Sequence, residues 1–301
     1  MSENTPPVCN YEGSDYQQKF WDLGGRAYED AVEQIALKNL LPPNGEWMLE
    51  IGAGAGRNTP RYKGYQRVAL LDYSRTQLEQ ARDRLGESQR YLYIAADAYR
   101  LPFMPNIFDG ATMIRTLHHM ADPQQALNQV HQVMQHDGVF ILEFANKRNI
   151  KSILRYMFRR QAWNPFDPEP VEFASLNFDF HPKSVRGYLD KAGFKIEKQL
   201  TVSHFRTAFL KRIVPLRLLV GLDSVLQVTG RWVQLTPSVF SRCRAVKPEK
   251  GTKSADEFFR CPSCSSPLPA ENEDLICKEC GQTWPFKDGI YDFRVQSELY
   301  D

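Results

Sequence analysis

The chain has 301 residues, of which 42% are hydrophobic and 25% are charged. These proportions are ordinary for a globular protein and exclude a fibre or a wholly disordered chain. The formal net charge of +2 gives no overall attraction to nucleic acid, so any such affinity would have to come from local patches. No stretch approaches the roughly 18 to 20 consecutive apolar residues that a membrane-spanning helix needs.

The amino-terminal segment gives two expectations. Residues 1–10 are polar and lack the basic start and apolar core of a secretory signal, so we expect a cytoplasmic protein. Residues 11–41 lead through several aromatic side chains to a predicted helix over residues 28–41, which Pro42 and Pro43 end.

A strand followed by a glycine-rich loop is predicted next. The apolar run over residues 48–51 contains Glu50 and is followed by three alternating glycines, Gly52, Gly54 and Gly56. Such a loop is typical of a strand that meets a nucleotide at its carboxyl end, because a Cβ would hold the backbone away from the ligand. The NAD fingerprint G-x-G-x-x-G requires a third glycine where Arg57 stands. The spacing therefore argues against NAD.

Two further apolar runs end in acids. Residues 68–71 lead to Asp72, about twenty residues after the glycine loop, where a carboxylate would hold ribose hydroxyls. Residues 91–95 lead to Asp97, whose carboxylate would accept a hydrogen bond from an adenine amine. Three strand ends are therefore predicted to converge on one nucleoside.

In this order and spacing, residues 45 to about 150 resemble a class I S-adenosylmethionine-dependent methyltransferase of the type 11 kind. Residues 108–120 resemble the family's fourth strand with its trailing histidine, and residues 124–143 resemble the helix and fifth strand that follow. The resemblance implies an α/β fold with a Rossmann-like, seven-stranded mixed sheet, and S-adenosyl-L-methionine as the cofactor. It also implies cofactor contacts from Glu50, Gly52, Ala53, Gly54, Asp72, Tyr73, Asp97, Ala98 and Arg115.

The same resemblance gives the segment ahead of the first strand a role. In the family this segment folds over the cofactor as a lid, which would bring Tyr16, Phe20 and Trp21 near the substrate or the methionine part of the cofactor. A purely structural role, in which these aromatics anchor the helix on the sheet, explains them equally well.

Two basic, amphipathic stretches follow the fifth strand. Residues 146–163 carry six cations and no acid, with apolar residues at helical spacing, and residues 205–235 predict one or two further helices. Between and after them we expect a helix over residues 183–192 and strands over residues 194–203 and 238–246. The basic faces fit a solvated helix surface, a phosphate-binding surface or, if the apolar faces are exposed, a membrane surface.

The chemistry of the acceptor is only partly constrained. His118 and His119 follow the fourth strand, where a general base would be placed, although helix capping or packing explains them as well. The family's Asn/Asp-Pro-Pro-aromatic signature for methylating amino groups of DNA or glutamine is missing after the fourth strand. No cysteine lies there either, which argues against cytosine C5 chemistry. His181 and His204 are interpreted as satisfied, buried histidines, and Cys9 and Cys243 are assigned no role.

Four cysteines near the carboxyl end have the spacing of a metal site: Cys261, Cys264, Cys277 and Cys280. Two C-x-x-C knuckles place four thiolates around one Zn²⁺, and the intervening residues suit a small β-hairpin. Residues 259–290 resemble the zinc-ribbon activator subunit of tRNA, rRNA and protein methyltransferases, which docks on a sheet edge of its catalytic partner. Zinc ribbons also bind RNA.

The sequence therefore predicts an amino-terminal helical lid (1–44), a methyltransferase domain (45–247) with helical insertions near 147–165 and 205–235, a linker (248–257) and a zinc ribbon (258–301). The predicted activity is methyl transfer to a small organic acceptor. The alternatives are methylation of rRNA or tRNA, and a noncatalytic scaffold that binds the cofactor. No membrane span is expected, and peripheral membrane contact and the oligomeric state stay open.

Overall fold

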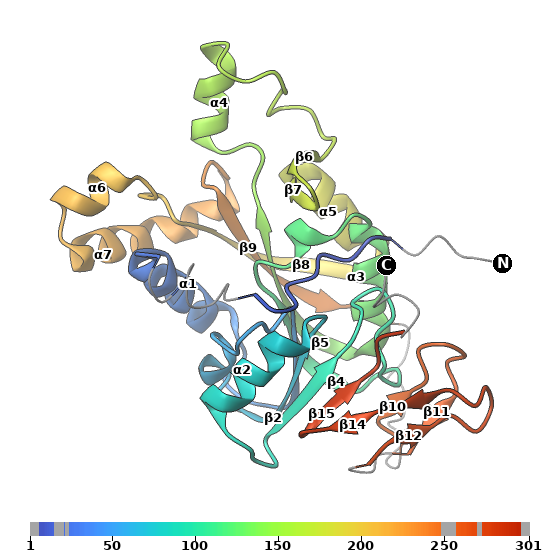
Figure 1. Ribbon diagram of the computed structural model, residues 1–301. Helices are drawn as coiled ribbons and strands as arrows, with labels where there is room; N and C mark the ends of the chain where they lie inside the picture. Colours follow the sequence, from blue (N-terminus) through green and yellow to red (C-terminus); the bar gives the residue numbers. More distant parts are fainter. Residues whose placement is uncertain (1–5, 15–20, 22–23, 248–256, 270–272, 296–301) are drawn as a thin grey trace.

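The structure is a computed structural model that describes residues 6–14, 21, 24–247, 257–269 and 273–295 (Figure 1). Its centre is a nine-stranded sheet in the order β14-β15-β3-β2-β1-β4-β5-β9-β8. The strands are β1 (Gly45–Ile51), β2 (Tyr65–Asp72), β3 (Tyr91–Ala95), β4 (Phe108–Met113), β5 (Met134–Ala145), β8 (Phe194–Val202), β9 (Ser238–Ala245), β14 (Phe286–Lys287) and β15 (Ile290–Asp292).

The seven strands from β3 to β8 confirm the predicted Rossmann-like mixed sheet. Strands β3, β2, β1, β4 and β5 run parallel, and β9 is antiparallel to both β5 and β8. The parallel strands are buried on both faces, which explains why their sequences are nearly continuous apolar runs. The strand order reverses between β1 and β4, and ligands of such sheets bind at the carboxyl ends of the strands next to this reversal.

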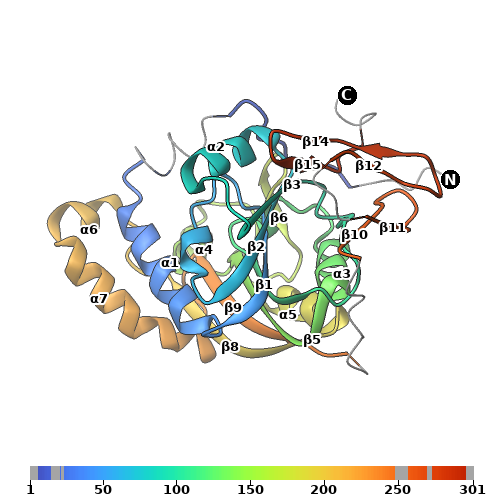
Figure 2. The ribbon, with the colours of Figure 1, turned by 90° about the horizontal axis from the view of Figure 1, so that it is seen from below.

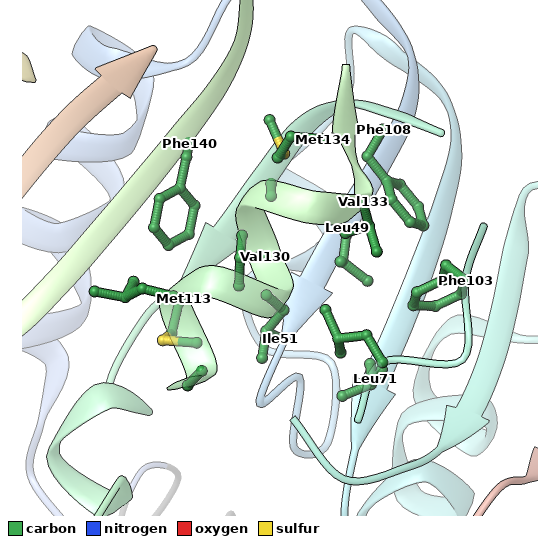
Figure 3. Packing of buried hydrophobic residues seen from close by; sticks show 14 of the residues in the cluster. Leu49, Ile51, Leu71, Phe103, Phe108, Met113, Val130, Val133, Met134 and Phe140 are labelled. Carbon is green, nitrogen blue, oxygen red and sulfur yellow. The ribbon is translucent and has the colours of Figure 1, made fainter. Parts of the chain in front are cut away.

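Helices cover both faces of the sheet. On one face lie α1 (Ala27–Leu40) and α2 (Arg75–Leu85), and on the other lie α3 (Pro123–Val133) and α5 (Pro182–Lys191). In Figure 3, Val130 and Val133 of α3 point toward Leu49 and Ile51 of β1. The first turns of α2, α3 and α5 are each capped by a side chain, from Ser74, Asp122 and His181 respectively. His181 thus has the satisfied, structural role that was expected.

Helices lie in both stretches where insertions were expected, and they project from the body of the molecule in Figure 1. The first contains α4 (Ile150–Met157), which Asn149 caps, and it is followed by a hairpin of β6 (Val171–Ala174) and β7 (Asn177–Asp179). The second contains α6 (Ala208–Ile213), α7 (Leu216–Leu226) and the short 3-10 helix η4 (Gln227–Arg231). No helix in the described part of the chain is long and apolar enough to cross a bilayer.

The carboxyl-terminal module, described over residues 257–269 and 273–295, packs on the edge of the sheet next to β3 (Figure 2). Strand β15 pairs in parallel with β3, and β14 pairs antiparallel with β15, which extends the sheet beyond the seven expected strands. Phe259 forms an isolated bridge with Phe103, and its ring packs among those of Phe103, Tyr291 and Phe293. The module and the catalytic sheet therefore share one hydrophobic core.

The pairing within the module differs from the hairpin expected between the two knuckles. Each knuckle is instead enclosed by its own two-stranded sheet, in which β10 (Phe259–Arg260) pairs with β11 (Pro267–Leu268) and β12 (Leu275–Ile276) pairs with β13 (Thr283–Trp284). Backbone hydrogen bonds close each turn locally, from Cys261 N–H to the carbonyl of Ser266 (2.8 Å) and from Cys277 N–H to that of Gln282 (2.9 Å). Most of the predicted linker, residues 248–256, lies outside the described residues.

Candidate functional site

A pocket lies at the carboxyl ends of β1, β2, β3 and β4, on the predicted side of the sheet. Its wall is built from the segments that follow these strands, including Gly52 to Ala55, Asp72 and Tyr73, Ala96 to Tyr99, and Ile114 to Thr116. Eight of the nine residues predicted to contact the cofactor line this pocket, and the ninth is Glu50. The structure therefore brings together residues that are far apart in the sequence.

The glycine loop has the backbone that its sequence predicts. Gly52, Gly54 and Gly56 have φ angles of +69°, +52° and +70°, a region that residues with a Cβ resist. A Cβ on Gly52 would lie 2.1 Å from Oγ1 of Thr116, whereas a Cβ on Gly54 would point into open space with its nearest neighbour 3.9 Å away. Because Gly54 lines the pocket, a side chain there would occupy the volume available to a ligand.

Asp72 fixes the loop from the neighbouring strand end. Its Oδ2 accepts a hydrogen bond from the backbone N–H of Gly54 at 2.8 Å, and its Oδ1 accepts one from Ser74 at 2.9 Å. Burial raises the pKa of Asp72, and the two backbone donors oppose that shift. A cofactor with vicinal hydroxyls fits an acid that is held in this way at the end of β2.

Glu50 lies beneath the loop, outside the pocket wall. Its carboxylate accepts hydrogen bonds from the hydroxyls of Thr59 (2.6 Å) and Tyr62 (3.2 Å). Burial raises its pKa from 4.5 to about 7, despite these two donors. The predicted cofactor contact of Glu50 stays a prediction, and in this structure its bonds join β1 to the segment after the glycine loop.

The amino-terminal segment closes one side of the pocket. Val8, Cys9, Tyr11 and Trp21 line it, and the Arg57 guanidinium lies 3.5 Å from the centre of the Trp21 ring system. Tyr16 and Phe20, named with Trp21 as lid residues, lie outside the described residues. Sequence reasoning did not find Val8, Cys9 or Tyr11, because nothing in the local pattern of a polar segment marks residues that contact a distant pocket.

The two candidate histidines differ in position. His119 lines the pocket, and its ring nitrogens lie 3.1 Å from the hydroxyl of Tyr11 and 3.0 Å from the carbonyl of Leu176. His118 does not line the pocket, although its ring centroid is 3.9 Å from that of His119. Burial lowers the pKa of both rings, for His118 well below its ordinary value with the charge of His119 adding to the shift. The lowered pKa values favour the neutral form of both rings at neutral pH.

A buried network of acids and arginines supports the pocket wall. The Glu33 carboxylate, fully buried in α1, accepts hydrogen bonds from Arg57 (2.8 Å) and from Nε of Arg115 (2.8 Å). Burial raises the pKa of Glu33, but Arg115 and Arg57 outweigh burial and hold the pKa below its ordinary value. Glu143 accepts a hydrogen bond from the backbone N–H of Arg115, whose φ is +56°. Arg115 is thus positioned by two acids from different elements.

The four predicted metal ligands converge. Their sulfur atoms all lie within 4.8 Å of one another, with 3.7 Å between Cys261 and Cys280 and 3.4 Å between Cys264 and Cys277. A zinc ion about 2.3 Å from four tetrahedral sulfurs separates them by roughly 3.8 Å. The cluster therefore fits one Zn²⁺, and Cys9 and Cys243 lie outside it.

The carboxyl-terminal module also reaches the pocket through charged side chains. Nη1 of Arg294 donates to Glu12 at 3.1 Å and to the carbonyl of Tyr73 at 3.3 Å. Nη2 of the same guanidinium donates to Asp292 at 2.6 Å. Glu12 in turn accepts hydrogen bonds from the backbone N–H groups of Arg75 and Thr76. One arginine thus connects the module, the amino-terminal segment and the turn after Asp72.

Comparisons with known proteins agree with this geometry. A family model described as a methyltransferase domain matches residues 49–142. The chain is 30% identical over 179 residues to the ubiquinone/menaquinone biosynthesis C-methyltransferase UbiE of Ruegeria sp. (strain TM1040), covering 56% of this chain and 69% of that protein. It is 37% identical over 100 residues to the O-methyltransferase cnsE of Penicillium expansum, covering 32% of this chain and 36% of that protein.

Solved structures show the same fold. A complex of the Haloferax volcanii Trm112 methyltransferase activator with a putative methyltransferase matches with a TM-score of 0.55 and 14% identity, covering 77% of this chain and 96% of the matched chain. A Thermotoga maritima S-adenosylmethionine-dependent methyltransferase, described as a possible histamine N-methyltransferase, matches with a TM-score of 0.53 and 22% identity, covering 77% of this chain and 95% of that one.

The sheet order and the pocket at its strand ends define a class I methyltransferase fold. With 30% identity over 69% of the Ruegeria enzyme, the chain belongs to the S-adenosylmethionine-dependent methyltransferase family of that enzyme. It spans only about a third of the fungal O-methyltransferase, so the substrates of these relatives do not transfer to it directly.

Proposed function

We propose that the pocket binds S-adenosyl-L-methionine and that the protein transfers its methyl group to a small organic acceptor. The observation that carries this proposal is the Gly54 position, where the loop backbone borders open pocket volume while Asp72 holds the same backbone from the next strand. Asp72 and Tyr73 would bind the ribose, and Asp97 and Ala98 the adenine. Gly52, Ala53, Gly54 and Arg115 would surround the methionine part, with Glu50 supporting the loop.

S-adenosyl-L-methionine supplies an electrophilic methyl carbon on a sulfonium, so the protein's task is to align the acceptor in line with that carbon and to exclude water. Trp21, Tyr11 and the apolar side chains of the wall provide an enclosed site for this. His119 is the candidate that reaches the pocket, and its neutral ring would take the proton of a hydroxyl or acidic carbon acceptor. His118 does not line the pocket, so it could affect the reaction only through its contact with His119.

We further propose that Cys261, Cys264, Cys277 and Cys280 bind a structural Zn²⁺ and that the module stabilises the catalytic sheet within the same chain. The support is the pairing of β15 with β3 and the shared aromatic core. The Haloferax complex pairs a methyltransferase with a separate activator protein, and a covalently attached module would fulfil such a role here. The predicted domain limits and a cytoplasmic location belong to the same proposal.

Methylation of rRNA or tRNA is the second candidate, because the two helical insertions carry many cations. The experiment that separates the acceptors uses S-adenosylmethionine with a radiolabelled methyl group and three acceptor pools: RNA, polar metabolites and lipid-extracted small molecules. We expect label in a small-molecule pool. Label in RNA would replace the first proposal by the second, and the absence of transfer to every pool, with cofactor binding intact, would favour a noncatalytic scaffold.

A further inference from the structure

The outer surface of the two helical insertions is rich in large apolar side chains that face solvent. We name residues 150–158 and 208–232 the helical surface. Met157 and Phe158 are 67% and 66% exposed, Phe209 is 70%, Val225 is 71% and Trp232 is 73%. Singly scattered apolar residues are normal on a protein, but here they recur along two neighbouring segments, which is typical of an interaction surface.

Positive charge accompanies these apolar residues. Residues 147–160 contain no acid, and residues 205–246 contain only Asp223. Asp223 is fully buried and bonded to Tyr28 and His204, so it does not offset the surface charge. No ion pair is present within the described part of the chain for the exposed cations Arg155, Arg159, Arg160, Arg212, Arg217 and Arg231.

The two segments of the helical surface face each other across a cleft. Ile150 and Arg155 of α4 line one side, and Ala208 and Lys211 of α6 line the other. Arg206 lies in this cleft, and burial followed by the nearby charge of Arg115 lowers its pKa. Arg115 lines the pocket at the strand ends. One residue of the cleft is therefore close enough to a residue of the pocket wall for their charges to interact.

We propose that the helical surface binds the face of an anionic lipid bilayer. This inference does not depend on the proposed function. Amphipathic helices with aliphatic and aromatic side chains on one side and Lys or Arg on the other lie in the membrane interface, where apolar burial and lipid charge act together. Trp232 beside Arg231 has the amphipathic chemistry of interfacial residues.

The exposed apolar side chains of the helical surface favour a membrane over the other partners that a basic surface could bind. Contacts with an RNA backbone use the cations and leave large aliphatic side chains in water. A second copy of this chain would meet the same excess of positive charge on both sides of the interface. A bilayer that contains acidic lipids satisfies both the apolar and the charged groups.

Flotation with lipid vesicles tests the surface directly. The zinc-replete full chain is mixed with vesicles of phosphatidylcholine, with and without phosphatidylglycerol. The double variant Met157→Glu/Phe209→Glu is compared with Ile276→Glu, which places one such charge on an exposed apolar site of β12 at the other end of the molecule. We expect binding only with phosphatidylglycerol, a loss of at least about tenfold in the double variant, and no change in Ile276→Glu.

A second pair of variants separates charge from apolar insertion. Arg159→Glu/Arg217→Glu is expected to weaken binding most strongly at low salt, because its effect is electrostatic. Calorimetry with S-adenosylmethionine on every variant shows whether the fold is intact and reports separately on the cofactor site. The inference is wrong if the wild-type protein does not float with anionic vesicles, or if the apolar double variant floats equally well. It is also wrong if the protein does not bind vesicles and instead binds RNA through these cations, or forms a dimer that depends on Phe209.

Discussion

Replacing Glu50 by glutamine is expected to change how the stability of the protein depends on pH. The carboxyl group is buried beneath the glycine loop, and burial raises its pKa from 4.5 to about 7. Between these values the folded protein holds a proton on Glu50 that the unfolded chain releases, so the free energy of unfolding falls as the pH rises through this window. Glutamine does not titrate, and this component of the pH dependence disappears in Glu50→Gln.

The size of the effect follows from the shift. At about 1.4 kcal/mol per unit, a pKa that moves from 4.5 to about 7 corresponds to about 3 kcal/mol in full, most of it between about pH 5 and pH 8. Glu50→Gln should therefore gain stability relative to the wild type by roughly this amount as the pH rises. The hydroxyls of Thr59 and Tyr62, which donate to Glu50, keep an acceptor in the amide oxygen.

Urea unfolding of both proteins at pH 5 and pH 8 measures this difference. Glu33→Gln is the matched control, because Arg115 and Arg57 hold the pKa of Glu33 below its ordinary value. The stability that Glu33 contributes is present above its unfolded pKa and is lost only as the pH falls below that value, so the stability difference between Glu33→Gln and the wild type should be nearly the same at pH 5 and pH 8. An equal stability difference between Glu50→Gln and the wild type at both pH values would refute the reasoning.

Three further predictions concern the pocket and the module. Gly54→Leu should abolish binding of S-adenosylmethionine in calorimetry, while Gly86→Leu, at another glycine with a positive φ and open space around it, should lose only stability, by about 1–3 kcal/mol. Arg294→Ala should weaken cofactor affinity by about three- to tenfold with the zinc content unchanged, because it loses its bonds to Glu12 and Tyr73; unchanged affinity would contradict this coupling. Removal of zinc by a chelator should lower the Tm of the whole protein in calorimetric scans, since the module shares the core of the sheet; an unchanged main transition would show that the module folds independently.

The parts of the site that the sequence predicted are those with a local signal. Gly52, Gly54 and Asp72 follow apolar runs, and the ends of parallel strands meet at one edge of a sheet, so their convergence follows from the pattern. The limits of α1 and α5 lie within one residue of the predicted ranges 28–41 and 183–192, and Pro42 and Pro43 mark the end of the first.

The parts of the site that the sequence did not predict depend on tertiary packing. Tyr11 reaches His119 across 108 positions, and Arg294 reaches Glu12 across 282, with no periodicity or motif that relates them. The cysteine spacing indicates how the module binds metal, but it carries no information on which strand the module pairs with. The pairing of β15 with β3 appears only when the edge strand and the aromatic core around Phe259 are seen together.

Calorimetric titration of the zinc-replete protein with S-adenosylmethionine tests the central claim most directly. The variants Asp72→Ala and Asp109→Ala form a matched pair, because each acid accepts hydrogen bonds from two backbone N–H groups, but only Asp72 lines the pocket. We predict micromolar binding in the wild type and in Asp109→Ala, and its loss in Asp72→Ala. Absence of binding in the folded wild-type protein, or equal binding in all three proteins, would contradict the proposed cofactor site.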